Sequence, residues 1–103
     1  MRNQIVAVKV VHYPVLNVTF ADGLDGNYDV GKDIERFVMF APLKDKGFFS
    51  KVSFDNNGYR LGWRLDEIGN ELDYGSDTIR CEVETAKVIE MAEQYRAKMQ
   101  AAE

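Results

Sequence analysis

The chain has 103 residues, of which 46% are hydrophobic, 12% aromatic and 29% charged. This length and composition predict one folded domain around a single hydrophobic core, and they exclude a second domain and a disordered chain. Thirteen Lys and Arg against seventeen Asp and Glu give a net charge of -4, so a generally acidic surface disfavours binding to the phosphate backbone of nucleic acids.

Targeting and redox features predict a cytoplasmic protein. Cys81 is the only cysteine, so no disulfide can form within the chain, and a reducing compartment is favoured. The apolar run near the N-terminus is interrupted by Lys9 and His12, unlike the apolar centre of a signal peptide. No segment approaches the roughly 18 apolar residues of a membrane span.

The N-terminal third predicts three strands. Residues 5–11 are almost continuously β-branched and predict a strand that ends before Pro14. Apolar side chains alternate through residues 15–21 and run into an Asp22-Gly23 turn, after which residues 24–30 return as a shorter edge strand. These features are typical of a β-hairpin.

The middle of the chain predicts a helix and a turn. Residues 34–40 place apolar side chains at helical spacing, so we expect a short helix that covers the sheet. Pro42 is expected to end this helix. Residues 43–50 predict a turn that returns two aromatic side chains, Phe48 and Phe49, to the core.

A second hairpin is predicted from residues 51–54 and 59–64, which flank an Asn-Asn-Gly turn. We therefore expect an α+β fold in which one antiparallel sheet is built from two hairpins. Residues 65–76 are polar and contain glycine, which predicts a loop with at most a short strand. Trp63 has two interpretations: it packs in the core, which we favour, or it anchors an interface with Arg64.

The C-terminal segment, residues 83–103, contains neither Gly nor Pro and is dominated by good helix formers. It predicts one helix, which can start as early as Thr78 with Ser76 or Asp77 as its cap. We therefore expect a core domain over residues 1–82 and a C-terminal helix that packs on this core or on a second subunit.

A heptad-like stripe of apolar and small side chains follows this helix at alternating spacings of four and three residues, formed by Val88, Ala92, Tyr95, Met99 and Ala102. The interpretation that we favour is that the stripe packs on the sheet of its own chain. The alternative is that it pairs with the same helix of a second copy.

The candidate catalytic and metal patterns are incomplete. Residues 25–29 supply oxygen ligands at the start of a calcium loop, but Val30 stands where the pattern needs glycine and Arg36 where it needs a bidentate Glu. Cys81 and His12 form a nucleophilic pair only if the fold brings them together, and we expect a buried structural cysteine instead. We interpret the acidic side chains of the polar loop as a solvated surface and not as a catalytic dyad; they are Asp66, Glu67, Glu71, Asp73 and Asp77.

Turn residues and apolar residues expected in the core also follow one another in a particular order along the chain. They are Leu16-x-Val18-x-Phe20-x-Asp22-Gly23, Tyr28-Asp29-Val30, Phe40-x-x-Leu43-x-Asp45, Phe49-x-x-Val52, Trp63, Gly69-x-x-Leu72-Asp73 and Asp77-Thr78-Ile79. Over residues 5–81 this order resembles the small bacterial Domain of Unknown Function family 2442. The resemblance implies an α+β fold with a curved antiparallel sheet and a short covering helix. That family has no established activity or cofactor, so no catalytic residue is implied.

Some members of that family continue into a helix-turn-helix that suggests DNA-linked regulation, whereas this chain supplies one uninterrupted helical segment there. Others are small stand-alone proteins suspected of working beside a companion protein. The resemblance therefore implies an acidic module that binds a protein partner.

We expect a non-enzymatic protein interaction or regulatory module that binds another protein or a second copy of itself, with no cofactor, metal or small-molecule substrate. The candidate interface residues are Trp63, Arg64, Val88, Ala92, Tyr95 and Met99. The alternative is a nucleic-acid-associated transcriptional regulator with basic side chains gathered on one face, namely Lys9, Arg60, Arg64, Arg80 and Lys87. A third hypothesis is a small-molecule-binding or hydrolytic protein with a pocket between helix and sheet.

Overall fold

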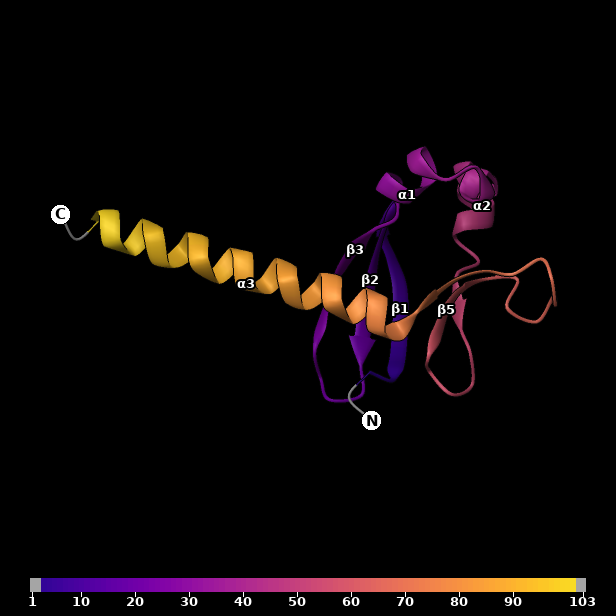
Figure 1. Ribbon diagram of the computed structural model, residues 1–103, viewed down its shortest axis with the longest axis horizontal. Helices are drawn as coiled ribbons and strands as arrows, with labels where there is room; N and C mark the ends of the chain where they lie inside the picture. Colours follow the sequence, from indigo (N-terminus) through magenta and orange to yellow (C-terminus); the bar gives the residue numbers. More distant parts are fainter. Residues whose placement is uncertain (1–2, 102–103) are drawn as a thin grey trace.

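The computed structural model describes residues 3–101, which form two small antiparallel sheets and a long C-terminal helix (Figure 1). The first sheet has the order β1 (Ile5–His12), β2 (Val15–Phe20) and β3 (Asp25–Asp29). The predicted hairpin at Asp22-Gly23 is confirmed, because β2 and β3 pair in antiparallel register across that turn. β3 is an edge strand of this sheet, also as predicted.

The second sheet has the order β4 (Ser53–Phe54), β5 (Arg60–Trp63) and β6 (Leu72–Gly75). The α+β class with antiparallel strands is confirmed. The two hairpins, however, belong to two three-stranded sheets and not to one. The loop predicted over residues 65–76 contains β6, which pairs with β5 and thereby completes the second sheet.

The side chains of β2 show that one face of the first sheet is buried more deeply than the other. Leu16, Val18 and Phe20 are buried, whereas the alternating Asn17 and Thr19 are only partly buried. Because successive side chains of a strand point to opposite faces, this alternation directs one face of the sheet into the core.

Three short helices connect the two sheets: α1 (Gly31–Arg36), the 3-10 helix η1 (Val38–Lys44) and α2 (Lys46–Phe49). The prediction that Pro42 ends a helix over residues 34–40 is wrong. α1 ends earlier because Phe37 is extended, with φ -119° and ψ 121°, and Pro42 lies inside η1. The predicted turn over residues 43–50 contains α2, which is capped by the Asp45 side chain.

Trp63 lies at the centre of the core with an exposed fraction of 0%. Its indole Nε1 donates a hydrogen bond of 2.8 Å to the carbonyl oxygen of Phe49, and its ring lies 5.5 Å from the ring of Phe49. The core interpretation of Trp63 is therefore confirmed. The interface interpretation is wrong, because no part of this side chain is accessible to a partner.

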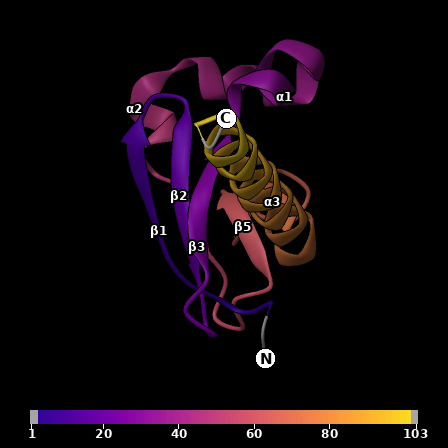
Figure 2. The same cartoon turned by 90° about the vertical axis from the view of Figure 1, so that its left-hand side faces the viewer.

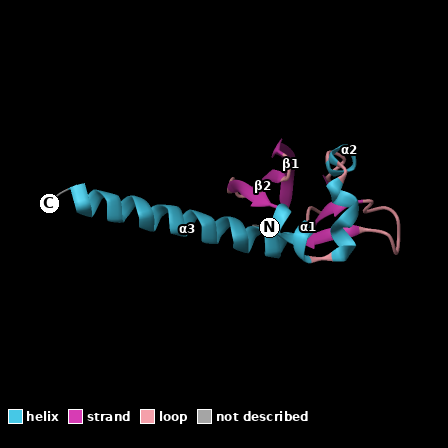
Figure 3. Ribbon diagram, turned by 90° about the horizontal axis from the view of Figure 1, so that it is seen from above, coloured by secondary structure: helices cyan, strands magenta, loops and turns pink. Residues whose placement is uncertain are grey.

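The C-terminal helix α3 (Ser76–Ala101) has 26 residues and follows β6 without a loop. It starts earlier than residue 83, so the predicted boundary between residues 82 and 83 falls inside the helix. Its first turns pack on the core through Ile79 and Val83, which are both buried. The rest of α3 extends past the sheets into solvent (Figures 1 and 3), and the described chain measures 58 × 31 × 19 Å.

Among the described residues, no helix combines the length and the apolar character that a membrane span requires.

Candidate protein interaction surface

The projecting segment of α3, residues 85–101, follows the first turns of the helix, which pack on the core. All side chains from Thr85 to Gln100 are exposed. Figure 2, which looks roughly along α3, shows the helix beside β3, and Figure 1 shows that it extends beyond both sheets. Most helical stability in proteins comes from packing, so the projecting segment lacks that source of stability within its own chain.

Apolar side chains gather on one side of the projecting segment. The exposed fractions are 65% for Val88, 66% for Tyr95 and 56% for Met99, and Ala92 is exposed between them. The favoured prediction, that this stripe packs on the sheet of its own chain, is therefore wrong. Ala102, the last predicted member of the stripe, lies outside the described residues.

The direction of the stripe follows from helix geometry. Val83 marks the side of α3 that packs on the body, since it contacts β3 at Gly26. At 3.6 residues per turn, Val88 lies about 140° from Val83 around the helix axis, Tyr95 about 120°, Ala92 about 180° and Met99 about 160°. The stripe thus lies on the side of the helix that faces away from the body.

Ile89 and Met91 widen the exposed apolar surface, with exposed fractions of 54% and 67%. If the stripe residues occupy the a and d positions of a heptad, Ile89 and Met91 occupy the flanking e and g positions. An apolar band that continues over several turns marks an interaction site more often than scattered apolar residues do.

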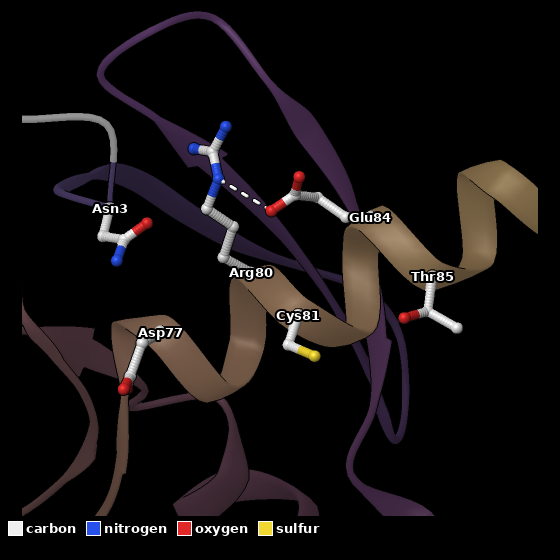
Figure 4. Close-up of a pocket in the computed structure, with 6 residues that line it drawn as sticks. All are labelled: Asn3, Asp77, Arg80, Cys81, Glu84 and Thr85. Carbon is white, nitrogen blue, oxygen red and sulfur yellow. Dashed lines mark hydrogen bonds and ion pairs between the residues drawn. The ribbon is translucent and has the colours of Figure 1, made fainter.

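A shallow groove of about 540 Å³ continues the stripe toward the start of α3 (Figure 4). It is lined by Asn3, Asp77, Arg80, Cys81, Glu84 and Thr85. Cys81 is exposed in it, so the prediction of a buried structural cysteine is wrong. Cys81 precedes Thr85 and Val88 by four and seven residues, which places it on the outward side of the helix.

Arg80 ties the first turns of α3 to the hairpin of the first sheet. Its guanidinium donates hydrogen bonds of 3.1 and 2.7 Å to the two carboxylate oxygens of Asp22 and one of 3.1 Å to Glu84. It also lies over the ring of Phe20 at 5.2 Å. The hydrogen bonds from Arg80 lower the pKa of Asp22 to about 2. These contacts fix the base of α3 and leave its outward side open.

A buried polar cluster joins the two sheets, and sequence reasoning missed it. The hydroxyls of Tyr28 and Tyr74 both donate to Oδ2 of Asp33, at 2.9 and 2.7 Å, and the two rings meet edge to face at 5.1 Å. Burial, with the hydrogen bonds to Asp33, raises the pKa of both tyrosines well above the ordinary value. The cluster links β3, α1 and β6, and it is closed to ligands because all three side chains are buried.

Arg64 lies apart from the stripe, at the end of β5. It is partly buried, adopts the left-handed φ of 56°, and places its guanidinium over the ring of Phe48 at 5.1 Å. Its Nε is buried without a hydrogen-bond partner among the described residues. β5 lies at the other end of the molecule from the projecting segment (Figure 1), so Arg64 does not join the stripe.

The remaining predicted site residues are dispersed. Within residues 3–101, no group of three or more His, Cys, Asp or Glu side chains is arranged to hold a metal ion. Cys81 lines the groove on α3, whereas His12 ends β1. Among the loop carboxylates, Asp73 pairs with Arg60 at 2.8 Å and Glu71 accepts from the Gly69 amide.

Comparisons with protein-family models, with curated proteins and with solved structures give no match for this chain. The resemblance to the Domain of Unknown Function family 2442 therefore stays a prediction.

Proposed function

We propose that this protein is a non-enzymatic interaction module that binds a protein partner through the projecting segment of α3. The observation that carries the proposal is the exposed stripe of Val88, Ala92, Tyr95 and Met99 on the side of α3 opposite its own body. An amphipathic helix that presents such a stripe is a common recognition element, because a groove or a second helix can cover its apolar side.

The base of α3 makes the projecting segment suitable for this role. Arg80 and Val83 hold the first turns of the helix against the first sheet, so the stripe is presented at a defined angle to the body. A rigid presentation lowers the entropy that binding must offset. The single exposed thiol of Cys81 fits the reducing cytoplasm, which we propose as the compartment.

The alternative function, nucleic-acid binding, is weakened by the ion pairs that two of the candidate basic residues make. Arg60 is paired with Asp73, and Arg80 is buried between Asp22 and Glu84. Both cations are thus neutralised by carboxylates of the same chain, and phosphate contacts would have to compete with these ion pairs. We therefore make no second proposal.

The test compares a charge introduced on the stripe with the same charge on the opposite side of the projecting segment. Val88→Glu changes the stripe, and Ala97→Glu is the matched control, since Ala97 lies about 180° from Val88 around the helix. Binding is measured by light scattering for the chain itself and by titration against any protein that co-purifies from the native host. Val88→Glu is expected to abolish association, and Ala97→Glu is expected to retain it.

The fold of each variant is checked through the fluorescence of Trp63, which reports on the core and lies far from both substitutions. The proposal is overturned if folded Val88→Glu associates as well as the unchanged chain does. It is also overturned if the unchanged chain associates neither with itself nor with a purified partner.

A further inference from the structure

We infer that the partner of the projecting segment is a second copy of this chain, and that the two α3 helices pair in antiparallel orientation. This inference rests on the proposed function, because it names the occupant of the same stripe. Side-chain size, charge and the open surface around the stripe each support it.

The sizes of the stripe residues are complementary only when the two helices run in opposite directions. With the two-fold axis between Glu93 and Gln94, Ala92 of one copy faces Tyr95 of the other, and Val88 faces Met99. Small residues then oppose large ones in successive layers, as close packing requires. A parallel pair in register instead places Tyr95 against Tyr95 and Ala92 against Ala92, which gives one overfilled layer and one empty layer.

The charged side chains of α3 also favour antiparallel pairing, because acidic and basic residues lie toward different ends of the helix. In the overlap of the two helices, residues 86–101, the first half carries Glu90 and Glu93 with one cation, Lys87. Glu82 and Glu84 precede the overlap and pair with Lys32 and Arg80 of their own chain. Between residues 94 and 101 the only charged side chains are Arg96 and Lys98. Antiparallel pairing lays the acidic half of each helix along the basic half of its partner, whereas parallel pairing aligns the two acidic halves. The opposed helix dipoles add to this preference.

The surface around the stripe leaves room for the second helix. The body packs on the Val83 side of α3, so a helix on the stripe meets no strand of the chain that it binds. At about 1.5 Å per residue, the projecting segment offers a contact about 25 Å long. With this axis the described end of the partner helix, Ala101, lies opposite Ala86, next to Thr85 at the edge of the open groove. The two bodies lie at opposite ends of the pair.

Disulfide trapping distinguishes the orientations. Two variants are made in a Cys81→Ser background, one with Val88→Cys and the other with Met99→Cys. In the antiparallel pair these two positions face each other, so a mixture of the variants forms a covalent dimer under mild oxidation. Two copies of Val88 are then about 16 Å apart along the axis, beyond the Cα separation of about 7 Å that a disulfide tolerates. Neither variant alone is expected to cross-link.

Light scattering on each cysteine variant before oxidation shows that it still associates. The inference is overturned if associated Val88→Cys cross-links efficiently with itself, which indicates a parallel pair. It is also overturned if an associated mixture does not cross-link, or if the unchanged chain is monomeric at every concentration tested. If the unchanged chain is monomeric but binds a different protein, and Val88→Glu abolishes that binding, the proposed function stands and the pairing of two copies is overturned.

Discussion

At the residue scale, the carboxylate of Asp33 satisfies two buried hydroxyls at once, those of Tyr28 and Tyr74. Asp33→Ala leaves both hydroxyls without a partner, and a buried unsatisfied polar group costs about 1–3 kcal/mol. We expect this variant to lower the free energy of unfolding in urea by about 2–4 kcal/mol. Asp33→Asn is the matched control, because one amide oxygen can still accept from both tyrosines. Equal stability of the alanine variant and the unchanged chain would contradict the role of the cluster.

The same two tyrosines make stability depend on alkaline pH. Burial raises the pKa of Tyr28 and Tyr74 in the folded chain, whereas in the unfolded chain tyrosine ionises near pH 10, at about its ordinary pKa. Their contribution is therefore fully present below about pH 10 and is lost as the pH rises above that value, by at most about 1.4 kcal/mol per pH unit for each tyrosine.

Urea unfolding at a series of alkaline pH values measures this loss of stability. Replacing both tyrosines by Phe is expected to flatten the dependence, since Phe cannot ionise. An unchanged slope in the double variant would assign the dependence to other groups.

At the scale of elements, the contact between α3 and β3 sets the direction of the projecting segment. Gly26 has no side chain, and a Cβ at this position would lie 2.6 Å from Cγ1 of Val83. Gly26→Ala is therefore expected to destabilise the fold by about 1–3 kcal/mol through overpacking. In a Val83→Ala background the same change should cost less, because the clashing methyl group is gone. A double-mutant cycle by urea unfolding measures this coupling, and strict additivity would show that the two residues do not restrain each other.

Local patterns were sufficient to predict the hairpins, because alternation through Leu16, Val18 and Phe20 and the Asp22-Gly23 turn act between neighbours in sequence. They were also sufficient to predict the existence of α3. The side of α3 that packs on the body could not be predicted in this way, since it depends on Val83 meeting Gly26, far away in the chain. For that reason the sequence pattern predicts burial for the stripe and for Cys81, although both face solvent.

The missed polar cluster has the same physical origin. Asp33 is an ordinary acidic residue of a short helix until β3 and β6 bring two tyrosine hydroxyls to it. Similarly, nothing in the pattern of residues 51–64 distinguishes one sheet built from two hairpins from two separate sheets, because that choice depends on which strands pair with each other. Long-range partners, and not local propensities, decided each of these differences.

At the scale of the whole molecule, the body and the projecting segment differ in what stabilises them. The first turns of α3 are held by buried Ile79 and Val83, whereas the side chains from Thr85 to Gln100 are all exposed. Without a partner, its helical hydrogen bonds should open with a free energy far below that of the body. Amide hydrogen exchange is therefore expected to be slow over residues 76–83 at every protein concentration.

Over residues 85–101, exchange should be fast in dilute solution and should slow as the concentration rises, because pairing adds stability by mass action. Val88→Glu should remove this concentration dependence and leave residues 76–83 protected, whereas Ala97→Glu should preserve it. Strong protection of residues 85–101 in a monomeric sample would contradict the prediction, since it would mean that the projecting segment is stable without any partner. The concentration at which protection appears would then measure how tightly two copies hold each other.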